Sequence, residues 1–475
     1  MYFKKLLLLF LTGILTYILL NSFLHVNAQN LVTIAISKQP MGVSTRYIGA
    51  VEGNVNFDIK DLQDLGINTY RIYGGMSRWE AEDDDGIYGQ PTISEIKANP
   101  NIINWDWWDK IMTEPPNNSD YWWSGNDTWQ GNARTIFSQL KQANIRPVVT
   151  LRNTDDAWNP SWALQLNPPR NEADWNEWWE HIFATVYWLN VRNDYQVDEF
   201  EIHNEPDNRP QGWGGNQADY FELVKVAKDA LDFVYKNYLP NRKYHIHAPV
   251  TIENSTWVLD ALQQIPTYFD SINIHDYQAD ISVYTQQVHT WMNSTIHANS
   301  PIWLGEWGTY QTDYENLDFA LNLIKNLLRG SLPGDNYIYG SHVFSLYDWG
   351  QSGIYRGLIS AEGKRSLGYY ALRMGIRGLQ GGKKTWVTST SNSDLIAIAT
   401  QDNNSDIYLL VINSSQESYP INADFSDFFT EGIGTIWEFS QQHRDEIVNS
   451  TNITQGQVNL TVPSQAAILV KIGAN

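Results

Sequence analysis

The chain has 475 residues, of which 53 are acidic and 32 basic, giving a formal net charge of −21, and it contains no cysteine. The length allows a barrel of about 250 residues or more together with a smaller unit. The lack of cysteine excludes disulfides and thiolate metal sites. The acidity argues against nucleic acid and polyanionic substrates and fits a neutral one, although it also serves solubility.

The first residues have the composition of a secretory signal. Two lysines precede an almost wholly apolar run over residues 6–20, and Ala28 stands at an expected cleavage position. We therefore expect a signal peptide over residues 1–28 and a protein that is secreted, periplasmic or held at the cell surface. Because the apolar stretch continues through Phe23, an uncleaved membrane anchor is the alternative. No later segment is expected to span a membrane.

Alternating strand and helix signals fill most of the chain. A weak alternation at residues 31–36 predicts a strand outside the barrel. The candidate barrel strands are residues 46–51, 69–72, 147–151, a segment ending at Glu205, 244–248, 271–274, 302–305 and 340–344. Helical periodicity lies between and after them at residues 59–65, 136–140, 174–189, 216–235, 258–262, 283–292, 317–328 and 367–374. Eight such alternations predict a closed parallel barrel whose active residues lie at the carboxyl ends of the strands.

A long excursion follows the second barrel strand, over residues 73–130. A segment of this length inside a compact domain is usually functional, and we expect it to rise over the carboxyl face of the barrel as one wall of a cleft. It is rich in tryptophan, whose apolar rings suit sugar faces. Its tryptophans are Trp79, Trp105, Trp107, Trp108, Trp122, Trp123 and Trp129.

The pattern changes after Gly381 and Gly382. Short segments rich in branched residues follow, separated by Asn, Ser, Asp and Gly. They are residues 395–400, 407–412, 435–439, 457–462 and 466–472. This pattern predicts an all-β module over residues 381–475, of the sandwich type.

Two glutamates stand at the ends of two predicted barrel strands. In the first strand Phe200 and Ile202 alternate with polar residues, so one face is apolar and the other carries chemistry. Glu205 lies where this strand stops, because the following proline cannot donate to a neighbouring strand. Glu306 closes a similar strand about one hundred residues later. We expect the two carboxylates to form the active site.

The triplet Asn204-Glu205-Pro206, together with Glu306, resembles clan A of the retaining glycoside hydrolases, which includes families 5, 30 and 39. The resemblance covers roughly residues 44–380. It implies a (β/α)₈ TIM barrel with a smaller all-β C-terminal domain, to which residues 29–43 add a strand. It also implies hydrolysis of β-glycosidic bonds in an oligo- or polysaccharide by double displacement, without a metal or other cofactor.

Matching the clan's motifs residue by residue assigns the roles. Glu205 is implied to be the acid/base and Glu306 the nucleophile, with Glu315 or Asp313 as nearby alternatives for the latter. The clan's equivalent of Asn204 binds the substrate 2-hydroxyl. Arg71 matches the arginine that keeps the nucleophile ionised.

Further substrate-site residues follow from the same resemblance. His275 and Tyr277 resemble the clan's His-x-Tyr element, in which the tyrosine hydrogen-bonds the nucleophile. Trp349 matches the position where the clan stacks a sugar, and Trp307 and Trp213 are weaker candidates. His203 precedes Asn204 in this chain, whereas several families of the clan have Trp or Gly at that position. The family within the clan is therefore left open.

Strict strand alternation creates one difficulty. Asn204 and Glu205 are neighbours and should point to opposite faces of the sheet. A bulge or the end of the strand must re-aim one of them.

Rival interpretations are weaker. His203, His245, His247 and His275 could converge on a metal, but the His-x-His pair lies on the fifth strand and there is no His-Glu-x-x-His run. The glycines at residues 212–215 lack the spacing of a phosphate loop. A secreted carbohydrate-binding protein whose barrel has lost catalysis is the alternative from another functional class. The sugar, the linkage, exo or endo action and the oligomeric state are left open.

Overall fold

The structure is a computed structural model that describes residues 31–52, 57–80, 87–113, 133–153, 168–208, 213–308, 313–348 and 356–473. The predicted signal peptide lies outside these ranges. Within them, no helix combines the length and hydrophobicity that crossing a bilayer requires.

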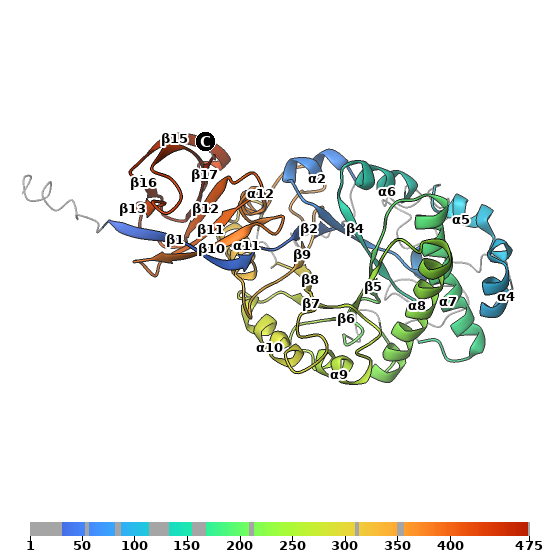
Figure 1. The fold of residues 1–475 in the computed structure, drawn as a ribbon. Helices are drawn as coiled ribbons and strands as arrows, with labels where there is room; N and C mark the ends of the chain where they lie inside the picture. Colours follow the sequence, from blue (N-terminus) through green and yellow to red (C-terminus); the bar gives the residue numbers. More distant parts are fainter. Residues whose placement is uncertain are drawn as a thin grey trace, which may run out of the picture.

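Eight parallel strands form a closed barrel in chain order, as predicted. Strand β2 pairs with both β3 and β9, and this pairing closes the circle. The strands are β2(Tyr47–Val51), β3(Thr69–Tyr73), β4(Arg146–Leu151), β5(Glu199–Ile202), β6(His245–Thr251), β7(Ser271–Asp276), β8(Ile302–Trp307) and β9(Gly340–Val343). Figure 1 shows the helices arranged around the outside of this barrel.

The barrel helices begin and end where capping chemistry allows. Asp58 accepts a hydrogen bond from the Lys60 amide at the start of α2, and Gly66 ends that helix with a φ of 85°. The helices around the barrel are α2(Ile59–Leu65), α6(Ala133–Gln142), α7(Glu172–Tyr187), α8(Gln217–Tyr238), α9(Trp257–Gln264), α10(Ser282–Met292), α11(Leu317–Gly330) and α12(Leu367–Leu379), with a π-helical turn η2(Trp188–Arg192) after α7.

The described part of the long excursion after β3 does not form the expected wall. It contains α3(Met76–Trp79), α4(Ile93–Ala98), η1(Pro100–Ile102) and α5(Trp105–Ile111). Trp105 stacks on Tyr187 of α7 with ring centroids 5.0 Å apart, and Trp79 and Trp108 are buried. Figure 1 shows α4 and α5 outside α7. These short helices are amphipathic, so their apolar faces pack on the outer helix layer. Trp122, Trp123 and Trp129 lie outside the described residues.

Polar and aromatic side chains fill the amino end of the barrel. Glu199, which begins β5, forms an ion pair with Arg146 and lies 3.0 Å from His247 Nε2. Trp303 of β8 stacks on Tyr47 with centroids 5.6 Å apart. This packing leaves the carboxyl end of the barrel as the place for a site, as is usual in this fold.

The remaining strands form an all-β module. It consists of β1(Val32–Val43), β10(Lys384–Thr390), β11(Leu395–Gln401), β12(Ile407–Asn413), β13(Tyr419–Asp424), β14(Glu431–Phe439), β15(Arg444–Thr454), β16(Gln457–Val462) and β17(Ala466–Ile472). The N-terminal strand β1 pairs antiparallel with β10 and parallel with β13. The hydrogen-bonded circuit closes, although β15 and β16 meet at a single residue pair. Three of these strands, β10, β13 and β15, were not predicted from the sequence.

Helix α12 joins the barrel to the β module. A Cβ on Gly378 would lie 3.2 Å from Leu469 of β17, so helix and strand pack closely. Asp445 of β15 is buried and accepts hydrogen bonds from Arg377 and, at 2.7 Å, from Arg373 Nε. The two parts therefore share an apolar and ionic interface.

Candidate active site

Glu306 lies at the carboxyl end of β8 with nearly all of its surface buried, and its oxygens are held by three side chains. Arg71 Nη1 donates to Oε1 at 2.6 Å, and the Tyr73 hydroxyl donates to the same oxygen. The Tyr277 hydroxyl donates to Oε2 at 2.5 Å. The sequence-predicted residues Arg71 and Tyr277 are thus both in contact with Glu306. Tyr73 is a partner that the sequence analysis missed.

These contacts determine the ionisation of Glu306. Burial would raise its pKa, but the charges of His275 and Arg71 and the hydrogen bonds from Tyr277 and Tyr73 outweigh burial and lower the pKa to about 2. The carboxylate is therefore ionised at neutral and mildly acidic pH. An ionised, buried and oriented carboxylate is suited to attack a developing cationic carbon.

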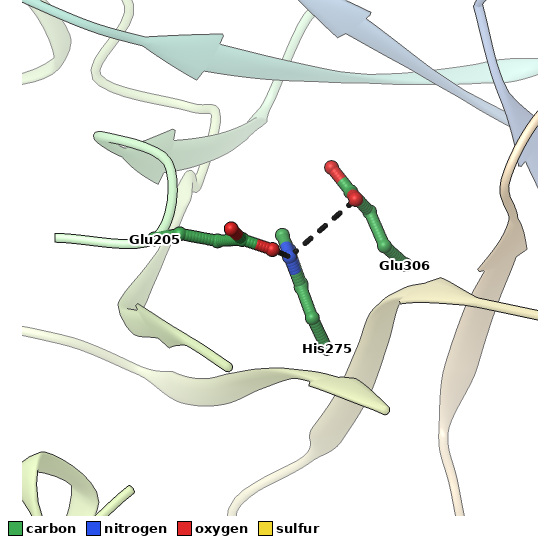
Figure 2. Close-up of side chains that lie close together, drawn as sticks. All are labelled: Glu205, His275 and Glu306. Atoms are coloured by element: carbon green, nitrogen blue, oxygen red, sulfur yellow. Dashed lines mark hydrogen bonds and ion pairs between the residues drawn. The ribbon is translucent and has the colours of Figure 1, made fainter. Parts of the chain in front are cut away.

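Glu205 lies beside Glu306 and is held by two donors. His275 Nδ1 lies 2.8 Å from Glu205 Oε1, and Asn208 Nδ2 donates to Oε2 at 2.9 Å. The same His275 nitrogen lies 3.6 Å from Glu306 Oε2. Figure 2 shows the imidazole between the two carboxyl groups. Burial lowers the pKa of His275, but the charge of Glu306 and the contact with Glu205 leave it raised overall.

The two carboxyl groups are close enough to act on one bond. An oxygen of Glu205, a nitrogen of His275 and an oxygen of Glu306 all lie within 4.8 Å of one another. Carboxyl pairs that work by nucleophile and acid/base are about 5–5.5 Å apart, whereas pairs that place a water between them are about 6.5–9.5 Å apart. The approach of the two oxygens is closer to the first range than to the second.

The backbone after β5 resolves the problem of neighbouring side chains. The strand ends at Ile202, and His203 and Glu205 then adopt positive φ angles of 66° and 44°. These left-handed residues break the alternation, as expected beside a functional site. Asn204 accepts a hydrogen bond from Arg71 Nη2 at 2.9 Å, and Glu205 meets His275. Both side chains therefore belong to one cluster.

Glu201 is a second member of this cluster that the sequence analysis did not assign. Its side chain is fully buried in the barrel and accepts a hydrogen bond from Arg71 Nε at 2.6 Å. The signal was available, since Glu201 lies on the same alternating face of β5 as the residues that carry the chemistry. Tyr73 likewise lies two residues after Arg71 on β3.

The aromatic residues divide between the site and the core. Phe344, just after β9, packs with Tyr73, Tyr277 and Val51 next to Glu306, and it was not predicted. Trp307 follows the inward-pointing Glu306, so it points outward into the core between barrel and helices and is only 1% exposed. The structure therefore does not bring Trp307 to the site.

Of the two other tryptophan candidates, the structure describes only Trp213. Trp213 is fully buried, with its ring centroid 4.9 Å from that of His203. Trp349 lies outside the described residues.

The histidines do not converge on one metal site. His245 and His247 contact Glu199 at the amino end of the barrel, whereas His275 lies at the carboxyl end. Within the described ranges, Glu205, His275 and Glu306 are the one group with the spacing of metal ligands. A cation there would face the Arg71 guanidinium, which lies 2.6 Å from Glu306, so this donor set fits a divalent metal poorly.

Comparisons with known proteins indicate an O-glycosyl hydrolase. Residues 202–365 match the sequence model of a family described as the glycosyl hydrolase catalytic core. Over 201 residues, 36% of the chain, the sequence is 27% identical to endoglucanase A of Paenibacillus lautus. The match spans only 27% of that protein's length.

Solved structures share the fold over almost the whole chain. A glucosidase from Croceicoccus marinus has a TM-score of 0.68 at 12% identity, over 94% of this chain and 99% of that one. A GH39 enzyme from Xanthomonas axonopodis pv. citri has a TM-score of 0.63 at 14% identity, over 94% and 98%. At such identities the likeness concerns the fold.

Proposed function

We propose that the chain hydrolyses β-glycosidic bonds with retention of configuration, because residues 202–365 match a glycosyl hydrolase catalytic core and the chain folds as a closed parallel barrel. The observation that carries the proposal is the pair Glu205 and Glu306, whose oxygens approach within 4.8 Å across His275. So close an approach supports double displacement, which needs the two carboxyl groups about 5–5.5 Å apart.

The first step forms a bond from Glu306 to the anomeric carbon and breaks the bond from that carbon to the leaving oxygen. Glu205 supplies the proton that the leaving oxygen needs. In the second step, Glu205 takes a proton from water, the water oxygen attacks the anomeric carbon, and the ester bond to Glu306 breaks. Arg71, Tyr73 and Tyr277 keep Glu306 ionised and aimed before attack.

Asn204 is suited to bind the substrate during both steps. Arg71 Nη2 donates to its Oδ1, which orients the amide and leaves the Nδ2 group for a sugar hydroxyl. A contact to the 2-hydroxyl that strengthens in the transition state would raise the rate rather than only the affinity.

A neutral oligo- or polysaccharide is the proposed substrate class. The formal charge of −21 disfavours polyanions, and the partial relative is named as an endoglucanase. Residues 1–28 support the proposal that the protein acts outside the cytoplasm, because a polysaccharide substrate is found there and the segment has a signal's composition.

Replacing the nucleophile tests the proposal. Glu306→Ala should lower kcat on aryl β-glycosides by about 10⁴-fold or more. Added azide should then restore turnover and give a glycosyl azide of inverted configuration, because the small anion enters the space of the lost carboxylate. Glu315→Gln is the control, since Glu315 pairs with Arg444 and Lys364 away from the cluster. Undiminished activity of Glu306→Ala would remove Glu306 from the mechanism.

The second candidate is a carbohydrate-binding protein without catalysis. It predicts that wild type and Glu205→Gln bind β-glucan and xylan equally and that neither releases reducing ends. The intact pair of glutamates, each with its hydrogen-bonding partners, favours the enzyme.

A further inference from the structure

Glu201 is a buried carboxylate one layer below the two proposed catalytic residues. Its Oε2 accepts hydrogen bonds from Arg71 Nε and from Thr150 Oγ1, both at 2.6 Å. Its Oε1 accepts from Asn273 Nδ2 at 2.5 Å. Three other barrel strands, β3, β4 and β7, thus fix one side chain of β5. Because Glu201 is fully buried, its side chain cannot reach a substrate.

Arg71 connects Glu201 to the reacting groups. Its three guanidinium nitrogens contact three different side chains: Nε meets Glu201, Nη1 meets Glu306 at 2.6 Å and Nη2 meets Asn204 at 2.9 Å. The guanidinium is planar and rigid, so fixing Nε fixes the direction of the other two donors. The position of Glu201 therefore determines how Arg71 holds the nucleophile and the sugar-binding amide.

The charges change during the proposed reaction. Before attack, one buried cation, Arg71, faces two carboxylates, Glu201 and Glu306. Once Glu306 is esterified to the sugar, it no longer carries a charge. Arg71 is fully buried, and a buried guanidinium without a counter-charge is strongly unfavourable. Glu201 is the carboxylate that still pairs with Arg71 in that intermediate.

A glycine in strand β8 leaves room for the Asn273 side chain, which donates to Glu201. Gly305 directly precedes Glu306, and a Cβ at this position would lie 2.1 Å from the Asn273 side-chain oxygen. Any larger residue would displace the amide that donates to Glu201.

We propose that Glu201 is a positioning residue, which orients Arg71 and balances its charge while Glu306 is esterified. This inference rests on the proposed function, because it concerns the glycosyl-enzyme. It predicts that loss of the Glu201 charge impairs formation of the intermediate, since Arg71 would then hold Glu306 as its sole counter-charge and oppose its neutralisation.

The test variant is Glu201→Gln, which keeps the shape of the side chain but removes the charge. Two matched controls, Glu199→Gln and Thr150→Val, separate the loss of charge from a structural effect. Glu199→Gln makes the same change two residues earlier on β5, where the buried carboxylate pairs with Arg146 and His247 instead. Thr150→Val removes a neutral hydrogen bond to Glu201 and keeps its charge.

The probes are 2,4-dinitrophenyl β-glucoside, β-cellobioside and β-xylobioside, and the matching 2-deoxy-2-fluoro glycosides, which trap the glycosyl-enzyme. For Glu201→Gln we expect kcat/KM and the trapping rate to fall about 100-fold or more, as a broken buried ion pair implies. Inhibition constants for cellobiose or xylobiose should change less than about threefold, because ground-state binding is retained. Glu199→Gln and Thr150→Val should stay within about tenfold of the wild-type kcat/KM.

Several results would overturn the inference. One is a Glu201→Gln enzyme with wild-type trapping rates, and another is an equal loss in all three variants, which would indicate a structural role only. If Glu201→Gln does not fold, Glu201→Asp replaces it. This variant keeps the charge but shortens the reach to Arg71, and trapping as fast as in the wild type would again overturn the inference. A wild type that hydrolyses no probe would instead refute the proposed function, and the inference with it.

Discussion

Glu205 and Glu306 are the same residue type in different surroundings. Glu306 is held by a guanidinium and two tyrosine hydroxyls, whereas Glu205 is held by an imidazole and an amide. The charge of His275 and the first set of contacts together lower the pKa of Glu306 to about 2 despite burial. Two carboxyl groups with different surroundings can take different roles in one reaction, as nucleophile and as acid/base.

Asp276, between His275 and Tyr277, allows a prediction at the same scale. Burial, helped by Glu253 and Asp280, raises its pKa from 3.8 to about 6, although the Gln278 amide acts in the opposite sense. Between these two pH values the folded state keeps a proton that the unfolded chain releases. The contribution of Asp276 to the stability of the protein therefore falls as the pH rises from 3.8 to about 6, and this cost stays constant above that pH.

Asp276→Asn removes this cost. The variant should be more stable than the wild type by about 1–3 kcal/mol at pH 8, and the gain should vanish below pH 4. Urea unfolding at pH 4, 5, 6 and 8 measures the difference. A gain of equal size at every pH, or a loss at pH 8, would show that Asp276 is not a buried acid with a raised pKa.

Individual site residues could be predicted from the sequence only where they match a motif of the clan. Asn204, Glu205, His275, Tyr277 and Glu306 all lie in the predicted cluster, and Arg71 joins them. Their catalytic and binding roles stay predictions. The partners of Glu201 could not be read from the sequence, because they come from three strands that are distant in the chain.

At the scale of elements, the periodic segments were the most predictable. The predicted helix at residues 59–65 agrees with the structure to the residue, since its cap and its closing glycine are both explicit in the sequence. Strands β10, β13 and β15 were missed because polar residues, and a proline in β13, interrupt their patterns. The left-handed turn at His203 and Glu205 overrides the alternation of β5, and strand period alone cannot predict it.

The tryptophan-rich excursion shows where composition misleads. Its described helix α5 buries Trp105 and Trp108 against α7. Tryptophan has enough apolar surface to serve either as a sugar platform or as a packing residue, and its location decides which.

At the scale of the whole molecule, the β module is docked on the barrel through α12. Asp445 is buried between Arg373 and Arg377. Removing one partner of such a pair leaves a poorly compensated charge in the interface. The interface therefore contributes to the stability of the barrel as well as of the β module.

Asp445→Asn tests this coupling. We expect it to destabilise the protein by about 3 kcal/mol and to separate the unfolding of the β module from that of the barrel in calorimetry. Glu315→Gln, which breaks the more exposed pair between Glu315 and Arg444 across the same interface, should cost at most about 1 kcal/mol. Equal effects of the two variants would contradict the assignment of Asp445 as the main ionic contact.

The stereochemistry of the first product tests the central claim most directly, because it depends on the distance between Glu205 and Glu306. Proton NMR during the first minutes of cellotetraose or xylotetraose hydrolysis reports the anomer before mutarotation. We predict that the β-anomer forms first and the α-anomer appears only at the rate of mutarotation. An α-anomer formed first would mean that water attacks the anomeric carbon directly, and it would refute Glu306 as the nucleophile.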